Sequence, residues 1–203
     1  MSTLKVDRLE SNTSGSITFA SPINPNGFSS NYRPGEIIET LSALCDGQSY
    51  TVSSGTYTTQ NVSSSQTYTD SYVDLNGSTL NYTAPTGTAI VIYEFFWLQA
   101  HTSANNIAHY RFYIDDVEVT DARLTESGGY EGTQVHFQWT IPIGGVADAA
   151  TGRQATWTTA KELRMEYRDY GSSNYGKLHE TTWWDGVGGN QFHRPQIKIT
   201  AIA

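Results

Sequence analysis

Thr88-Ala-Ile-Val-Ile-Tyr-Glu-Phe-Phe-Trp-Leu-Gln-Ala-His101 is the most apolar stretch of the chain. Its length is typical of one long strand, and it falls short of the ~18 apolar residues of a membrane span. A run this continuous predicts a strand buried on both faces, between two sheets or between subunits. No other stretch is more apolar, so we expect no insertion into a membrane.

Segments on both sides of this run alternate apolar and polar residues, as strands with one buried face do. Thr133–Ile141 shows the pattern clearly. Lys161–Arg168 fits a helix in composition, but its strict alternation favours a strand. Glu36–Leu44 fits either a strand or a short helix. Gln66–Leu75 also predicts a strand, and Asn76-Gly77 after it predicts a hairpin turn.

These segments amount to roughly ten strands, with turn signals every ~8–14 residues and no convincing long helix. Such spacing favours an all-β fold, a jelly-roll-like antiparallel β-sandwich. The last apolar segment, Gln196–Ala203, runs to the final residue. We therefore expect any attachment to other proteins to come from the N-terminal side.

The first 34 residues do not fit this sandwich. They hold short alternating runs around turn-rich sequence, then a segment dense in Pro, Asn, Gly and Ser, and have too few apolar residues for a core. We predict an extended N-terminal arm and linker over residues 1–34 and a head domain over residues 35–203. The residues expected to bind a partner through the arm are Leu4, Val6, Leu9, Ile17 and Phe19.

Composition and charge limit the partners. The chain has 203 residues, with 12 basic and 20 acidic side chains and a net charge of -8. This balance disfavours binding to nucleic-acid phosphates. Cys45 is the only cysteine, so no internal disulfide forms, and we expect it to be a small core residue.

No catalytic or metal motif stands out. The five histidines show no metal-ligand spacing, and packing roles are favoured for them; they are His101, His109, His136, His179 and His193. Asp115-Asp116 with Glu118 and Asp121 suits a calcium loop in composition, but a hairpin turn is favoured.

Alternating charges mark a second polar segment. Glu162, Glu166 and Asp169 alternate with basic residues, which favours a solvated, charge-paired face over a carboxylate pair for glycoside hydrolysis. We predict no catalytic residues, no metal and no cofactor, and a glycan-cleaving enzyme ranks last among the functions considered.

Aromatic residues near Gly-, Ser- and Asn-rich loops carry some functional signal. Exposed rings stack on sugar faces while nearby polar groups orient the hydroxyls. The alternative, which we favour, is core or inter-subunit packing. The residues concerned are Tyr170, Tyr175, Trp183, Trp184 and Phe192.

The opening Ser2-Thr-Leu-Lys-Val-Asp-Arg-Leu-Glu-Ser-Asn-Thr-Ser-Gly-Ser-Ile-Thr-Phe19 resembles the N-terminal segment of virion structural proteins from tailed phages of marine bacteria, cyanophages especially. The rest of the chain resembles the domain that often follows this segment. The stretches that carry the likeness are Val91–Phe95, His109–Asp115, Val117–Arg123, Trp157–Lys161 and Ile197–Ala203.

This resemblance implies a homotrimer on a virion, assembled in the host cytoplasm, as a fibre, tail appendage or capsid decoration. The sandwich that ends in a C-terminal strand is also similar to trimeric heads of the C1q and tumour-necrosis-factor type. The arm would then bind another virion protein. A module that binds a host-surface glycan through the aromatic loops is the alternative function.

Overall fold

The computed structural model describes residues 32–101, 107–127, 132–171, 176–185 and 189–203. This part of the chain is built of strands, and its one helical element is the 3-10 turn Thr120–Ala122. The strands are β1 (Ile37–Leu44), β2 (Ser49–Val52), β3 (Gly55–Thr58), β4 (Gln66–Thr67), β5 (Val73–Asp74), β6 (Leu80–Tyr82), β7 (Ile90–His101), β8 (Ile107–Ile114), β9 (Val117–Glu118), β10 (Leu124–Ser127), β11 (Thr133–Pro142), β12 (Lys161–Asp169), β13 (Gly176–Leu178), β14 (Glu180–Trp184), β15 (Gly189–Phe192) and β16 (Gln196–Ile202).

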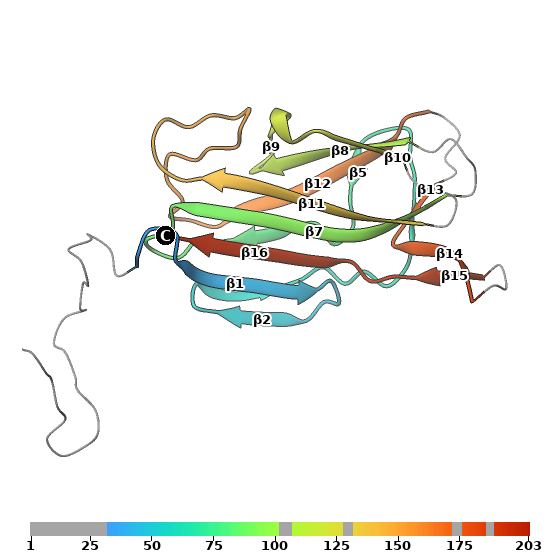
Figure 1. Ribbon diagram of the computed structural model, residues 1–203, viewed down its shortest axis with the longest axis horizontal. Coiled ribbons are helices and arrows are strands. Elements are labelled where there is room, and N and C mark those ends of the chain that lie inside the picture. The colour runs from blue at the N-terminus through green and yellow to red at the C-terminus, as the bar shows by residue number, and fades with distance from the viewer. Residues whose placement is uncertain (1–31, 102–106, 128–131, 172–175, 186–188) are drawn as a thin grey trace, which may run out of the picture.

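Two antiparallel sheets pack face to face (Figure 1). The first has the order β1-β16-β7-β13-β4, and β11 also pairs with β7. The second has the order β10-β8-β12-β5, with β6 on β12 and β9 on β8. Two small hairpins, β2–β3 and β14–β15, complete the described fold. The prediction of a jelly-roll-like antiparallel β-sandwich is confirmed.

The apolar run forms β7, the central strand of the first sheet, between β11 on one edge and β16 with β13 on the other. Its inward residues Val91, Tyr93, Phe95 and Trp97 are 0% exposed and face the second sheet. The outward apolar residues are only half-buried. The expectation of a strand covered on both faces by two sheets is therefore wrong, because within one chain a second layer covers only the inner face.

The core between the sheets is rich in aromatic rings. Tyr93 packs on Phe112 with ring centroids 4.9 Å apart, and Trp97 packs on Tyr110 at 5.0 Å. Buried tyrosines need partners for their hydroxyl groups. The Tyr93 hydroxyl donates to the Ser78 carbonyl at 2.6 Å, and the Tyr110 hydroxyl donates to the side chain of Gln99. These bonds link each sheet to the segments that face it.

The predicted strand Gln66–Leu75 and the hairpin after it are wrong in detail. β4 pairs with β13 in the first sheet, whereas β5 pairs with β12 in the second, so the segment crosses between sheets. β6 pairs with the same edge of β12 as β5, and the Asn76-Gly77 turn joins two strands that lie end to end.

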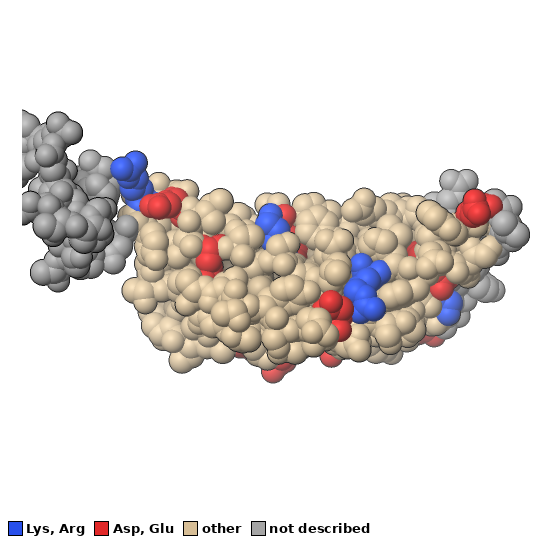
Figure 2. All heavy atoms as spheres, turned by 90° about the horizontal axis from the view of Figure 1, so that it is seen from below, with Lys and Arg blue, Asp and Glu red and all other residues tan. Residues whose placement is uncertain are grey.

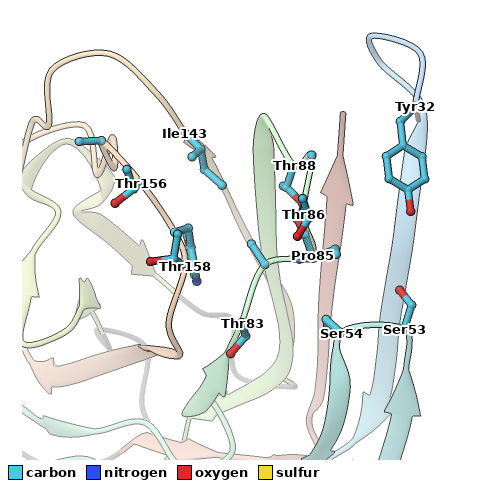
Figure 3. Close-up of a pocket in the computed structure, with 14 residues that line it drawn as sticks. Tyr32, Ser53, Ser54, Thr83, Pro85, Thr86, Thr88, Ile143, Thr156 and Thr158 are labelled. Carbon is cyan, nitrogen blue, oxygen red and sulfur yellow. Dashed lines mark hydrogen bonds between the residues drawn. The ribbon is translucent and has the colours of Figure 1, made fainter. Parts of the chain in front are cut away.

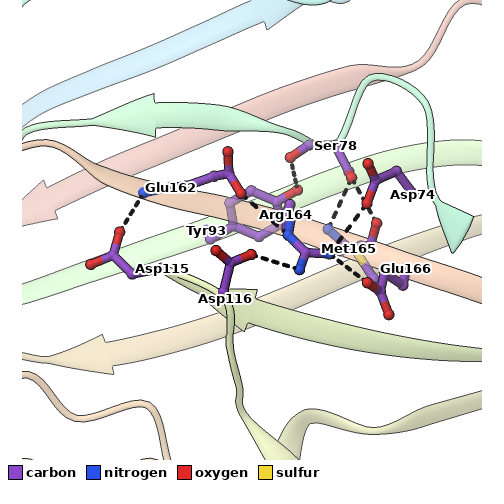
Figure 4. A network of polar contacts seen from close by, with 9 residues as sticks. All are labelled: Asp74, Ser78, Tyr93, Asp115, Asp116, Glu162, Arg164, Met165 and Glu166. Atoms are coloured by element: carbon purple, nitrogen blue, oxygen red, sulfur yellow. Dashed lines mark hydrogen bonds and ion pairs between the residues drawn. The ribbon is translucent and has the colours of Figure 1, made fainter. Parts of the chain in front are cut away.

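Ser78 bridges the gap between β5 and β6. Its buried Oγ accepts a hydrogen bond from the Met165 N–H at 2.9 Å and donates to the Met165 carbonyl at 3.2 Å (Figure 4). One side chain thus satisfies backbone groups of β12 that a continuous neighbouring strand would have satisfied.

The other sequence expectations concern single strands. Glu36–Leu44 forms the strand β1, and the alternating Lys161–Arg168 forms most of β12, with Leu163, Met165 and Tyr167 all 0% exposed. The choice of a strand for Lys161–Arg168 is confirmed. Cys45 is also 0% exposed, as expected of a small core residue.

The first and last described residues meet at one end of the head. The Gly35 N–H donates to the Ala203 carbonyl at 2.6 Å, and the Ala203 N–H donates to the Glu36 carbonyl at 2.9 Å. β14 and β15 lie at the opposite end (Figure 1). We call these the arm end and the distal end. The domain boundary at residue 34 stays a prediction, although residues from Tyr32 onward already contact the head.

Candidate functional site

The distal hairpin β14–β15 carries the two most exposed tryptophans of the described chain. Trp183 is 53% exposed and Trp184 is 64% exposed. Neighbouring residues of a regular strand point to opposite faces, but the pairing register shifts between Thr181 and Trp184. Trp183 has a φ of 59°, a conformation that a bulky side chain rarely adopts. This bulge allows both rings to stay in solvent, so packing in the core is wrong for Trp183 and Trp184.

The other three aromatic residues of the predicted site do not all lie on the hairpin. Tyr170 is 67% exposed and directly follows β12, where its ring contacts the His109 ring at 5.7 Å. Phe192 lies on β15, opposite Glu180, and packs partly against the core. Tyr175 lies outside the described residues. The structure therefore places Trp183, Trp184 and Phe192 on one hairpin and Tyr170 on a neighbouring segment.

His179 fixes the base of this hairpin, a role that the sequence did not indicate. It lies between β13 and β14, is 0% exposed and has a φ of 63°. Its N–H donates to the Leu98 carbonyl at 2.7 Å, and its carbonyl accepts from the His193 N–H at 2.8 Å. Burial lowers the pKa of the ring to about 4; the Asn76 backbone opposes this shift and His193 adds to it. The ring is therefore neutral at pH 7.

The acidic turn Asp115-Asp116 connects β8 and β9 (Figure 4). Both residues have positive φ, 49° and 63°, as a two-residue hairpin turn requires. Their carboxylates pair with cations: Asp115 with Lys161 at 2.7 Å and Asp116 with Arg164 at 3.0 Å. The turn interpretation is confirmed, and the calcium alternative loses these two carboxylates to ion pairs.

Arg164 is the centre of the charge-paired face on β12 (Figure 4). Its guanidinium lies 3.2 Å from Glu162 and 2.6 Å from Glu166, and it also contacts Asp74. The expected face is confirmed for Glu162 and Glu166. Asp169 is an exception, because it is 4% exposed and shares the inward side of β12 with Tyr167.

A cation–aromatic stack on the same face was not anticipated. Arg111 lies 3.6 Å from the ring centre of Tyr72, and Arg168 lies 5.3 Å from it. Tyr72 lies within the predicted strand Gln66–Leu75, but alternation along one segment does not show a contact with arginines of distant strands. The stack ties the segment before β5 to β8 and β12.

The predicted arm residues Leu4, Val6, Leu9, Ile17 and Phe19 all lie outside the described residues. What the structure does describe is a pocket at the arm end, of about 680 Å³ (Figure 3). Tyr32 lines one side, and residues 83–88 and 155–158 line others. Sequence patterns gave no signal for this pocket because its walls are irregular segments far apart in the chain.

A buried carboxylate supports one wall of the pocket. Glu39 on β1 accepts hydrogen bonds from the hydroxyls of Ser53 and Ser54, from the Ser54 N–H at 2.9 Å and from the Tyr82 hydroxyl at 2.6 Å. Burial alone would raise its pKa, but these bonds outweigh burial and lower it. The carboxylate therefore holds the β2–β3 turn as a fixed anion.

No group of three or more His, Cys, Asp or Glu side chains in the described part of the chain is arranged to hold a metal ion. No helix among the described residues is both long enough and apolar enough to cross a membrane.

No protein-family description and no curated protein matches this chain. Among solved structures, infectious bursal disease virus of the Gt strain matches with a TM-score of 0.38 and 10% identity, over 90% of this chain and 43% of the viral chain. The Gx strain matches at 0.35 and 15%, over 89% and 41%. A family two carbohydrate esterase from Cellvibrio japonicus matches at 0.27 and 10%, over 80% and 34%. The chain thus spans about two fifths of the viral chains, and TM-scores this low do not decide its function.

Proposed function

We propose that the chain is a non-enzymatic structural protein of a virion, a trimeric head held on the particle by its N-terminal arm. The observation that carries the proposal is the two-ended layout of the head. The described chain enters beside Ala203 at the arm end, and the exposed tryptophans lie on the hairpin at the distal end (Figure 1). A protein that is anchored through one end and presents the other needs this arrangement.

The resemblance of residues 2–19 to phage virion proteins supports the same role. In that setting Leu4 and Val6 are the anchors, because residues two apart lie on one face of a strand added to a partner's sheet. A fibre, a tail appendage and a capsid decoration all fit this layout.

Deletion of residues 1–31 tests the attachment role. This truncation keeps Tyr32 and Arg33, which contact the head. We expect a folded head whose melting temperature falls by no more than about 5 °C and which no longer joins particles. The full-length variant Leu4→Ser with Val6→Ser is the matched control and should also fail to join. Normal incorporation of either protein would contradict the proposal.

The trimer is a separate element of the proposal. The half-buried apolar residues on the outer face of β7, such as Ile92, Phe96 and Leu98, would gain cover from neighbouring chains. We expect a native mass of three chains at micromolar concentration. The mass of a single chain would exclude the trimer without affecting the attachment role.

Binding of a host-surface glycan is the second candidate function, and it overlaps with the first. The exposure of Trp183 and Trp184 on one hairpin favours it. A glycan array first identifies a glycan that the intact chain binds. For that glycan, Trp183→Ala or Trp184→Ala should reduce the binding free energy by ~1–3 kcal/mol while the protein stays folded.

A surface variant away from the hairpin, Val117→Ala, serves as the control for that experiment. If each tryptophan variant unfolds, the rings are structural and the glycan hypothesis loses its main residues. Release of reducing sugar from host polysaccharide by the intact chain would instead show an enzyme.

A further inference from the structure

The pocket at the arm end is uncharged. Half of its 14 lining residues are Ser or Thr, and the others include the apolar Pro85, Ile143 and Trp157 (Figure 3). None of these described lining residues carries a charge. Its volume of about 680 Å³ is in the range of pockets that bury most of a ligand, ~300–1,000 Å³. A suitable occupant is therefore neutral, with apolar groups and hydrogen-bonding groups.

The segment next to the pocket in sequence has that chemistry. Residues 11–31 contain no Asp, Glu, Lys or Arg, since the charged side chains before Arg33 all lie within Lys5–Glu10. Residues 22–30 combine two prolines, Ile23 and Phe28 with Ser and Asn. Prolines favour an extended backbone, and an extended backbone suits a groove between two wall segments.

The chain enters the head through this pocket. A Cβ on Gly87 would lie 3.1 Å from a ring carbon of Tyr32, so the ring lies close against the pocket wall. Gly87 has a φ of 93°, a conformation in which glycine is favoured. Tyr32, the first described residue, therefore lies at the pocket.

Tethering makes the chain's own segment the favoured occupant. Phe28 is four residues from Tyr32, which allows at most ~14 Å of extended chain between them. A segment on so short a tether has an effective concentration on the order of millimolar. A second copy at micromolar concentration competes poorly with it.

We propose that this pocket binds residues 22–30 of the same chain, with Phe28 over the apolar surface of Pro85, Ile143 and Trp157. The bound segment fixes the direction in which the arm leaves the head. Binding of residues 22–30 in the pocket does not depend on the virion role, because it concerns only the contact between the arm and the head.

Disulfide trapping in the full-length chain tests whether residues 22–30 bind in the pocket. The pair Phe28→Cys and Thr156→Cys places one thiol on the segment and one on the pocket wall. In the control pair, Phe28→Cys is combined with Leu44→Cys, an exposed position at the other end of β1. The native Cys45 is buried, and burial raises the pKa of its thiol to about 12, so it stays unreactive.

We expect a disulfide within one chain that forms at least roughly tenfold faster at Thr156 than at Leu44 in micromolar protein. Equal rates, or links only between chains, would overturn the proposal and indicate a loose arm or an arm from a second copy.

Alkylation gives a second readout that does not need disulfide geometry. The thiol of Thr156→Cys should react at least roughly tenfold faster when Phe28→Ser is added. An unchanged rate would also overturn the proposal. Neither result alters whether residues 1–31 are needed for incorporation into a particle. Failure of the pocket proposal and failure of the virion role are therefore distinguishable.

Discussion

Acidification should weaken the head through His179, and the substitution His179→Asn should remove that effect. The ring is 0% exposed, and the Asn76 backbone, which favours the charged form, does not offset the effect of burial. Asparagine does not titrate between pH 4 and 8, and it tolerates the positive φ of this position. The variant therefore removes the titration and keeps the backbone.

The size of the effect follows from the two pKa values. The ordinary pKa of histidine is 6.5, and burial lowers it to about 4 in the folded chain. The unfolded chain therefore binds more protons between these values. The contribution of His179 to the free energy of unfolding is fully present above pH 6.5. It falls as the pH drops from 6.5 to 4 and changes no further below pH 4. At ~1.36 kcal/mol per pKa unit, the loss is ~3 kcal/mol overall and ~2 kcal/mol at pH 5.

The assay is urea unfolding followed by tryptophan fluorescence at pH 7.5, 6 and 5, at one protein concentration. His193 is the titratable group that acts electrostatically on the ring, and Glu180 is the next residue in the chain. The control variant is His109→Asn. Burial also lowers the pKa of this half-buried surface ring, so the variant should reduce the pH dependence, but by less than His179→Asn does. A pH slope that persists unchanged in His179→Asn would refute the assignment.

Three further outcomes are expected from thermal or urea unfolding. Glu39→Gln should cost ~1–3 kcal/mol at pH 7, because it removes the anion that the surrounding donors stabilise; the loss should vanish as the pH falls through the lowered pKa of Glu39, and a loss that persists at pH 2 would contradict this. Ser78→Ala should reduce the free energy of unfolding by ~1–3 kcal/mol, because the buried N–H of Met165 loses its acceptor. Ser78→Thr keeps a hydroxyl group and should lose less. Gly176→Ala should destabilise by several kcal/mol, because its Cβ would overlap the buried ring of Tyr68, and a wild-type melting temperature would show that the ring has room to move.

The sequence predicts the strands that show a continuous apolar run or a regular alternation. β7, β11 and β12 follow directly from apolar runs and alternation, because each buries a face against the opposite sheet. The segment Gln66–Leu75 has the same alternation, but it divides between two sheets. Its period of two fits both short strands, and nothing local in the sequence marks the point where it crosses.

The sites depend on contacts between distant segments, which a single sequence does not display. The exposure of Trp183 and Trp184 fits the glycan-binding alternative and rules out the core packing that the sequence favoured, and the bulge that exposes both rings was not visible in the sequence. His179 was expected to pack, yet only the fold shows that it is wholly buried at the base of the hairpin. The pocket at the arm end is made by loops, where periodicity carries no information.

The distal hairpin combines two unfavourable features. Two charged groups away from the hairpin are well paired: Glu39 accepts four hydrogen bonds, and Arg164 pairs with carboxylates from three segments. At the hairpin, the ring of His179 is buried and only the Asn76 backbone favours its charged form, and Trp183 has a backbone conformation that costs ~1–3 kcal/mol. A hairpin that served stability alone would carry an apolar residue and a glycine or asparagine at these positions. Because natural proteins break such rules mainly where a site requires it, these features favour binding at the distal end, with the arm end left for attachment.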